Sequence, residues 1–396
     1  MNSVWKNYAS TLLLTAGLVV GGALGILWPE AAHSLKPLGD IFLNLLFVLV
    51  VPLVFFSVTT AFQRLRAGGN VGRVLGRMMA AFVVLWMASA VLAYISTLVV
   101  NPLGDTGGIA SPGEAQQPAS WAEALTGALT VPDFPRLFSK FSLLPLIVFS
   151  AILGTGVSLS GEKGRPFASF LESGNEVTTK AMSLLMKAAP VGLGCYFAEI
   201  VASVGRQILG GYLRVFIIYW CLALIVIFLI FPAVMRLTRG KGAIGSWWRN
   251  ILPPSLTAMA TESSSVAIPG NIEAAKGMGI DGNIAETVVP VGTNLLKAGS
   301  VMGDVLKVVF LLTLCGQTMS GPGAWAVCIG LAIMASVVTG AVVGGNVTGE
   351  LLICTVLGLA PENAGIIIII GTIIDIPATI INSQSTVVAA SIVDRK

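Results

Sequence analysis

Residues 261–265 read Thr-Glu-Ser-Ser-Ser and interrupt an apolar segment that extends over 245–277. A second interruption, Gly-Ala-Val-Val-Gly-Gly-Asn at 340–346, divides the apolar segment 320–358. Irregular backbone at membrane depth is stable only where protein or a water-filled cavity surrounds it. Two broken segments in the second half of a chain are typical of an inverted repeat whose breaks meet at a binding site. We therefore expect two re-entrant hairpins that enclose such a site.

The composition predicts an all-α polytopic membrane protein. Of the 396 residues, 55% are hydrophobic and 11% are charged, whereas soluble domains carry about 25% charged residues. The net charge of +4 is spread thinly, without the basic and aromatic clusters typical of nucleic-acid binding. His33 is the sole histidine, and the five cysteines have no Cys-x-x-Cys spacing. A histidine-based metal site or catalytic triad is not expected, nor is a cofactor.

Basic residues in the loops predict the orientation of the chain. The expected membrane segments are 8–28, 39–64, 75–101, 138–160, 175–204, 211–236, 245–277, 283–314, 320–358 and 364–392. Lysine and arginine follow the second, fourth and sixth segments, whereas 101–135 contains neither. Because cytoplasmic loops are enriched in these residues, we expect both termini in the cytoplasm. This orientation requires that 245–277 and 320–358 do not cross the membrane fully. The expected location is the bacterial or archaeal cytoplasmic (inner) membrane.

Several stretches together carry a resemblance to a known family. They are 41–57, 144–154, 189–192, the serines at 263–265, and 335–359. In order and topology they resemble the dicarboxylate/amino acid:cation symporters, the glutamate transporter homologues. The resemblance implies a homotrimer in which each chain has eight membrane helices and two re-entrant hairpins. It also implies an elevator mechanism, in which a transport domain slides against a scaffold domain.

The resemblance also implies domain boundaries. Residues 1–74 would hold scaffold helices 1 and 2. Residues 75–160 would hold transport helix 3, a long extracellular loop and scaffold helix 4. Residues 161–210 would be scaffold helix 5, and 211–244 transport helix 6. Residues 245–396 would form the transport core, with hairpin 1, helix 7, hairpin 2 and helix 8.

Three serines at the first break offer hydroxyl and backbone N–H groups at the start of a half-helix. Such a helix end favours an anion, and in the family this tip holds the substrate carboxylate. The alternative for Ser265 is a helix cap. Ser263 and Ser264 belong to the same predicted unit. The glycine-rich second tip, with Val342 and Gly344, resembles the family's gate, although a tight turn alone would use the same residues.

Asp375 lies in the middle of the last apolar segment, where a carboxylate is costly and therefore functional by default. It matches the family's aspartate that binds the substrate amino group. Asn382 lies two helical turns further on the same face and matches the asparagine that helps hold the substrate carboxylate. An interhelical hydrogen bond is the alternative for Asn382. The resemblance adds Ser300 and Thr379 to the substrate-binding set.

One departure from the family concerns the substrate. Members that transport aspartate or glutamate carry an arginine at the position of Ala378. Without that arginine an acidic substrate side chain would lack its bidentate partner. We therefore expect Ala378 to line a site for a small neutral amino acid. A sodium- or proton-coupled dicarboxylate or amino acid symporter remains the alternative.

Other departures concern sodium. The family's Asn-Met-Asp-Gly-Thr break reads Leu-Lys-Ala-Gly-Ser at 296–300, and Thr386 replaces a late aspartate. Polar ligands of the third helix are replaced near Leu85 and Trp86. Our hypothesis is that Lys297 substitutes electrostatically for a bound sodium ion. A residual backbone sodium site near Gly292 and Asn294 is the remaining metal candidate.

The coupling ion stays open among sodium, a proton and none. Glu262 would pair with Lys297 or carry a proton; a solvated glutamate is the alternative. Asp304 and Glu350 are weaker coupling candidates. A different class, an intramembrane hydrolase using Ser264 and Lys297, lacks any further active-site motif, and a channel is a third class. We expect a transporter and no enzymatic activity.

Overall fold

A computed structural model describes residues 2–64, 71–104, 130–139, 142–204, 207–316, 321–339, 346–359 and 363–395. The helices are Asn2–Leu27 (α1), Pro29–Arg64 (α2), Val71–Val99 (α3), Phe134–Leu137 (α5), Leu143–Leu159 (α6), Arg165–Met186 (α7), Ala189–Val204 (α8), Gln207–Ile225 (α9), Phe231–Arg239 (α10), Ala243–Thr261 (α11), Ile268–Gly277 (α12), Gly282–Leu295 (α13), Ala298–Leu314 (α14), Pro322–Thr339 (α15), Asn346–Val356 (α16) and Ala364–Val393 (α17). A 3-10 turn, Gly161–Gly164 (η1), precedes α7, and a π-helical turn, Val226–Ile230 (η2), joins α9 to α10. The described residues contain no strand, which confirms the all-α prediction.

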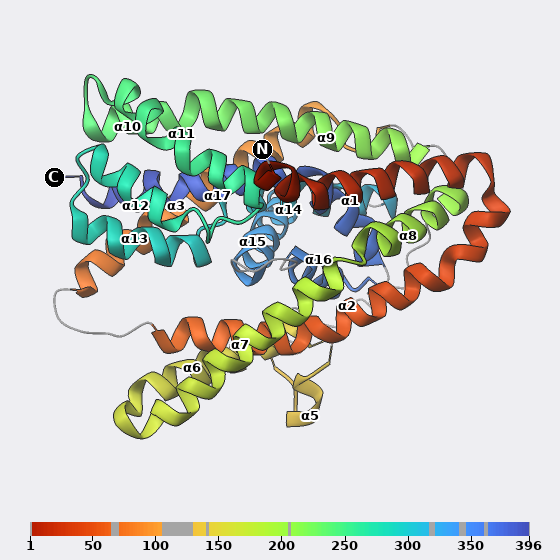
Figure 1. The fold of residues 1–396 in the computed structure, drawn as a ribbon, viewed down its shortest axis with the longest axis horizontal. Coiled ribbons are helices and arrows are strands. Elements are labelled where there is room, and N and C mark those ends of the chain that lie inside the picture. Colours follow the sequence, from red (N-terminus) through yellow and green to blue (C-terminus); the bar gives the residue numbers. More distant parts are fainter. Residues whose placement is uncertain are drawn as a thin grey trace.

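The long helix α17 is the centre of the larger packing group. It contacts α3 and each of the helices from α9 to α14, together with α16. Figure 1 shows α17 surrounded by α3, α11, α12 and α14. Nearly all of its residues are buried, and Asp375 is the single charged residue between its ends. Helices that bury apolar residues all round belong to the interior of a bundle.

A second packing group contains α1, α2, α6, α7 and α8. Helix α2 contacts α6, α7 and α8, while α1 packs mainly on α8. In Figure 1, α6 and α7 lie along α2 on the side away from α11 and α12. These are the helices assigned above to the scaffold. The two groups are also in contact, since α8 packs on α9 and α17, and α16 packs on α2 and α6. Their division into a scaffold domain and a transport domain stays a prediction.

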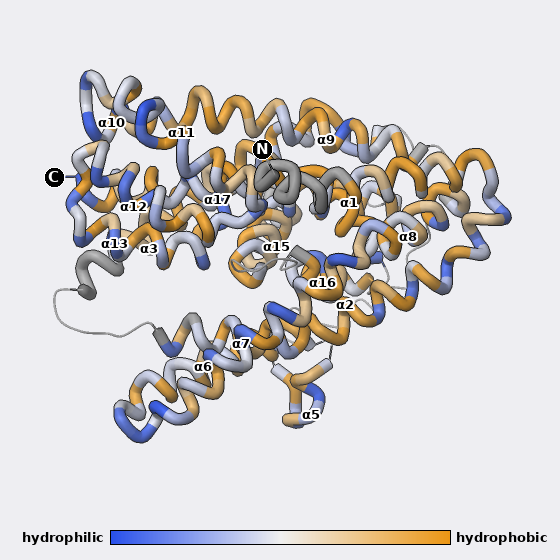
Figure 2. Tube along the Cα trace, viewed as in Figure 1, coloured by the Kyte–Doolittle hydropathy of each residue, from blue (hydrophilic) through white to orange (hydrophobic). Residues whose placement is uncertain are grey.

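Apolar side chains cover much of the outer surface. Val48 on α2 is 70% exposed, and Leu229, in the turn after α9, is 65% exposed. Figure 2 shows hydrophobic residues over most of α9, whereas hydrophilic ones gather where α6 joins α7. Such a surface requires lipid as its solvent. Four described ranges are long and apolar enough to span a membrane: Pro29–Thr60, Gly76–Val99, Ile208–Arg239 and Ala364–Val393. The expected count of eight crossings and two hairpins stays a prediction.

The structure differs from the expected single helix at 175–204. Two helices replace it, α7 and α8, which meet at an angle of 59° with a break at 187–188. Pro190 accounts for the break, because it has no N–H to donate to the carbonyl of Met186. The N–H of Gly192 instead bonds to the carbonyl of Ala188 at 2.9 Å, which starts a new helix.

The interrupted segments fold as paired helices. Helices α11 and α12 pack against each other and are separated at 262–267, one residue beyond the start of the predicted break. Helices α15 and α16 also pack together. Their predicted tip, with Val342 and Gly344, lies outside the described residues. A third break, at 296–297, divides α13 from α14.

Candidate functional site

The break between α13 and α14 is held open by Asn382 of α17. The Oδ1 atom of Asn382 accepts hydrogen bonds from the backbone N–H groups of Gly299 at 2.8 Å and Ser300 at 3.2 Å. Its Nδ2 atom donates to the Ser300 Oγ at 3.0 Å. A helix N-terminus leaves such N–H groups without intrahelical partners. Asn382 therefore caps α14 from a neighbouring helix, as the alternative for this residue anticipated, and its contact with substrate stays a prediction.

Gly299 brings the backbones of α14 and α17 into contact. A methyl group added there would lie 2.9 Å from the Cα of Ala378 and closer still to its carbonyl oxygen. From the other side, the buried hydroxyl of Tyr219 on α9 donates to the Gly299 carbonyl at 2.9 Å. The break is thus fixed by two helices. Tyr219 was missed in the sequence, where its hydroxyl within an apolar run was the available signal.

Lys297 connects the two breaks. It precedes α14 with φ −111° and ψ 56°, and its side chain is 4% exposed. Its Nζ atom donates to the Oγ of Ser264, in the 262–267 turn, at 3.2 Å. The negative charge of Asp375 interacts electrostatically with the Lys297 ammonium. Two helix breaks and the middle of α17 therefore place a lysine, a buried serine and a carboxylate in one region.

Glu262 lies beside the same group in an unusual backbone conformation. Its φ of 50° makes it the one non-glycine residue with positive φ among the described residues. Left-handed backbone is unfavourable for a residue with a Cβ atom, at about 1–2 kcal/mol. The charge of Asp375 acts on Glu262 as well as on Lys297. Glu262 is thus half-buried in the turn, near enough to Asp375 for their charges to interact, and its pairing with Lys297 stays a prediction.

The remaining predicted residues surround this region. Ser263 and Ser265 are half-buried in the turn before α12, and the Ser265 carbonyl accepts the Ile268 N–H at 3.2 Å. Thr379 is buried on α17, next to Ala378. The N-cap residue of α12 is Ala267, whose side chain cannot cap the helix.

The residual sodium candidate is covered by apolar groups. A methyl group at Gly292 would lie 3.3 Å from both the Phe82 ring and the Thr386 methyl. Trp86 packs against Phe82, with ring centroids 6.2 Å apart. The exposed Asn294 uses its Nδ2 atom to donate to the Pro290 carbonyl at 3.0 Å. The backbone sodium site near Gly292 and Asn294 stays a prediction.

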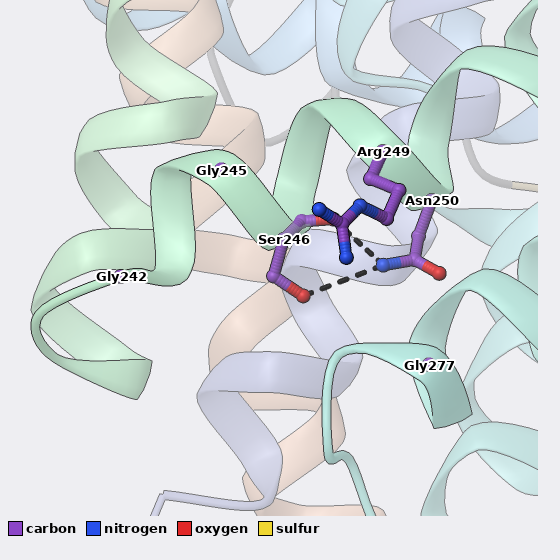
Figure 3. Close-up of a pocket in the computed structure, with 6 residues that line it drawn as sticks. All are labelled: Gly242, Gly245, Ser246, Arg249, Asn250 and Gly277. Atoms are coloured by element: carbon purple, nitrogen blue, oxygen red, sulfur yellow. Dashed lines mark hydrogen bonds between the residues drawn. The ribbon is translucent and has the colours of Figure 1, made fainter.

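A surface pocket lies at the far end of the α11–α12 pair, away from the 262–267 turn. Figure 3 shows its six lining residues, Gly242, Gly245, Ser246, Arg249, Asn250 and Gly277. Asn250 bonds within its own helix, donating to the Ser246 carbonyl at 2.7 Å. None of the predicted substrate residues lines this pocket, so the candidate site is the buried region around Lys297.

These features define a membrane transport protein: broken apolar helices bring charged and hydroxyl groups to a buried region beside the middle of α17. The chain belongs to the sodium:dicarboxylate symporter family, whose model matches residues 11–396. It is therefore a transporter and not an enzyme, as expected. It is 26% identical over 370 residues to a C4-dicarboxylate transport protein of Rhizobium leguminosarum, covering 89% of this chain and 81% of the relative. A C4-dicarboxylate transport protein of Bacillus subtilis is 23% identical over 322 residues, covering 78% and 75%.

Proposed function

We propose that the chain is a secondary transporter of a small neutral amino acid, which binds between Lys297 and Asp375. The observation that carries the proposal is the opposite charge of these two groups beside the buried hydroxyl of Ser264. A zwitterion matches that pattern: Asp375 would receive the ammonium group, and Lys297 with the serine turn would receive the carboxylate. Ala378 offers no cation for a second carboxylate.

The second proposal concerns coupling. Lys297 takes the place of a bound sodium ion, and transport does not require sodium. The support is the apolar cover over Gly292, where Phe82 and the Thr386 methyl approach most closely. Without substrate, the ammonium of Lys297 balances Asp375 in the way a bound cation would. Glu262 is the candidate for a proton exchanged with the substrate site, because the negative charge of Asp375 interacts with the Glu262 carboxylate.

The wider mechanism follows the family resemblance. We propose an elevator in which α3 and the helices from α9 to α17 move against α1, α2 and α6 to α8, within a homotrimer whose chain termini are cytoplasmic. The two packing groups described above support this division.

A C4 dicarboxylate is the second candidate substrate. The relatives' names favour it, and the ammonium of Lys297 next to Ser264 would bind one carboxylate. The second carboxylate would then meet Asp375 and Glu262, which repel it, unless those groups bind protons. This distinction makes the two candidates separable by experiment.

The test is uptake into proteoliposomes of labelled neutral amino acids and C4 dicarboxylates, with sodium and proton gradients imposed separately. We expect uptake of an amino acid without sodium, and its loss in Asp375→Asn. Glu176→Gln is the matched control, because the Glu176 side chain is 74% exposed on α7. Uptake of dicarboxylates alone would refute the amino-acid proposal. Strong sodium dependence would refute the role of Lys297.

A further inference from the structure

A second group of buried charges lies outside the candidate substrate site. Lys307 on α14 donates from its Nζ atom to the Asp304 Oδ1 at 3.0 Å and to the Glu350 Oε1 at 2.6 Å. The Ser336 hydroxyl of α15 donates to the Asp304 Oδ2 at 2.6 Å. Exposed fractions are 3% for Asp304, 4% for Lys307 and 0% for Glu350. This carboxylate–lysine cluster connects α14 to both helices of the α15–α16 pair.

The two carboxylates differ in how many of their oxygens accept hydrogen bonds. Both oxygens of Asp304 accept hydrogen bonds, which is the environment of an ionised carboxylate. Glu350 receives Lys307 on one oxygen, and its Oε2 atom has no hydrogen-bond partner among the described residues. Helix α17 packs against the other oxygen at Gly371, where an added methyl group would lie 2.7 Å from the Glu350 Oε1. Because Glu350 is 0% exposed, solvent does not supply the missing partner of Oε2.

The charges do not balance if both carboxylates are ionised. One ammonium and two carboxylates leave one net negative charge in a fully buried position. A buried charge without a counter-charge is far less favourable than a buried polar O–H, so such a group binds a proton instead. The unsatisfied oxygen of Glu350 identifies where that proton resides. Lys307 and Asp304 then remain as a neutral pair, and the Glu350 Oε1 still accepts from Lys307.

Other charges near the cluster do not remove this excess. Lys307 and Asp304 are the titratable groups whose fields act on Glu350. Tyr219 on α9 lies near both Asp304 and Asp375, and its hydroxyl donates to the Gly299 carbonyl at 2.9 Å, so it adds no positive charge. The other helices packed on α16 add no counter-charge: α6 and α15 contain no charged residue, and neither Asp375 of α17 nor any charged residue of α2 acts on Glu350.

We propose that the Asp304–Lys307–Glu350 cluster is a proton-binding site, which takes up one proton per chain on the Oε2 atom of Glu350. Proton uptake completes the charge balance between α14 and the α15–α16 pair, and proton release leaves one uncompensated charge at their contact. The site is separate from Lys297 and Asp375, so the proposal does not depend on which solute the chain transports.

The experiment is infrared difference spectroscopy of the purified full-length chain in lipid, between acidic and alkaline pH. A protonated carboxyl group has a C=O stretch that disappears on ionisation. We expect one such band from the buried carboxyl of Glu350, distinct from any band of Glu262, and we expect Glu350→Gln to remove it. Glu262→Gln is the matched control, because it removes the other carboxylate proposed above as a proton carrier and leaves this cluster intact. The band should persist in that variant.

Isotope labelling tests the assignment without a substitution. Carbon-13 in the carboxyl groups of all glutamates should shift the band in the unaltered chain, which covers the case in which Glu350→Gln does not fold. A band that persists in folded Glu350→Gln overturns the proposal, as does a band that the glutamate label leaves unmoved. The absence of any protonated carboxyl band in the unaltered chain also overturns it.

Discussion

Replacing Lys307 by methionine should be among the most destabilising substitutions in this chain. Methionine keeps much of the side-chain volume but removes the ammonium that contacts Asp304 at 3.0 Å and Glu350 at 2.6 Å. Removing one partner of a buried ion pair costs about 3–5 kcal/mol, because the other charge stays buried. At about 1.4 kcal/mol for each factor of ten, the folding equilibrium should fall roughly 10²- to 10⁴-fold.

The assay is reversible unfolding of the purified chain in mixed detergent micelles. Lys180→Met is the matched control: Lys180 also has a carboxylate partner, Glu176 at 3.6 Å, but both side chains are 74% exposed. Surface pairs of this kind contribute little, so no measurable change is expected there. Adding Asp304→Asn to Lys307→Met should restore part of the stability, since it removes the carboxylate charge that loses its partner. Equal stability of the Lys307 and Lys180 variants would refute the reasoning.

Two further predictions concern the break before α14. Gly299→Ala should lose about 1–3 kcal/mol of stability, because its methyl group meets the backbone of Ala378 and not a movable side chain. Gly210→Ala, with nothing within 4 Å of the added methyl, should be neutral or stabilising in the same unfolding assay; equal losses would contradict the close contact. Lys297→Met should reduce uptake in proteoliposomes about 10- to 100-fold, since a charge-assisted hydrogen bond contributes about 1.5–3 kcal/mol. Unchanged uptake would remove Lys297 from the site.

The position of the first helix break was readable from the sequence. A run of serines or glycines in an apolar segment has an obvious physical meaning, and the structure places the first break at 262–267. The bend between α7 and α8 was also marked, by Pro190 and by Lys187 just before it, but a single helix was predicted across 175–204. Hydropathy reports which residues avoid water, whereas the direction of a helix depends on a single missing N–H.

The candidate site was predictable only residue by residue. Asp375 and Lys297 are conspicuous because each is a charge in an apolar run, but nothing in the sequence says that Asn382 bonds to the N–H groups of Gly299 and Ser300. Those two hydrogen bonds join residues that are 83 and 82 positions apart in the sequence. Lys307 was overlooked although Asp304 lies one helical turn before it.

The same buried cluster constrains how the chain enters the membrane during synthesis. Asp304 and Lys307 are three residues apart on α14, so they can pair while that helix is inserted alone. Glu350 arrives later as the single charged residue of α16, 43 residues after Lys307. An ionised carboxylate at the centre of an inserting helix costs about 2.5–3.5 kcal/mol. Glu350 therefore inserts most readily as the neutral acid. It contacts Lys307 only when the α15–α16 pair packs against α14.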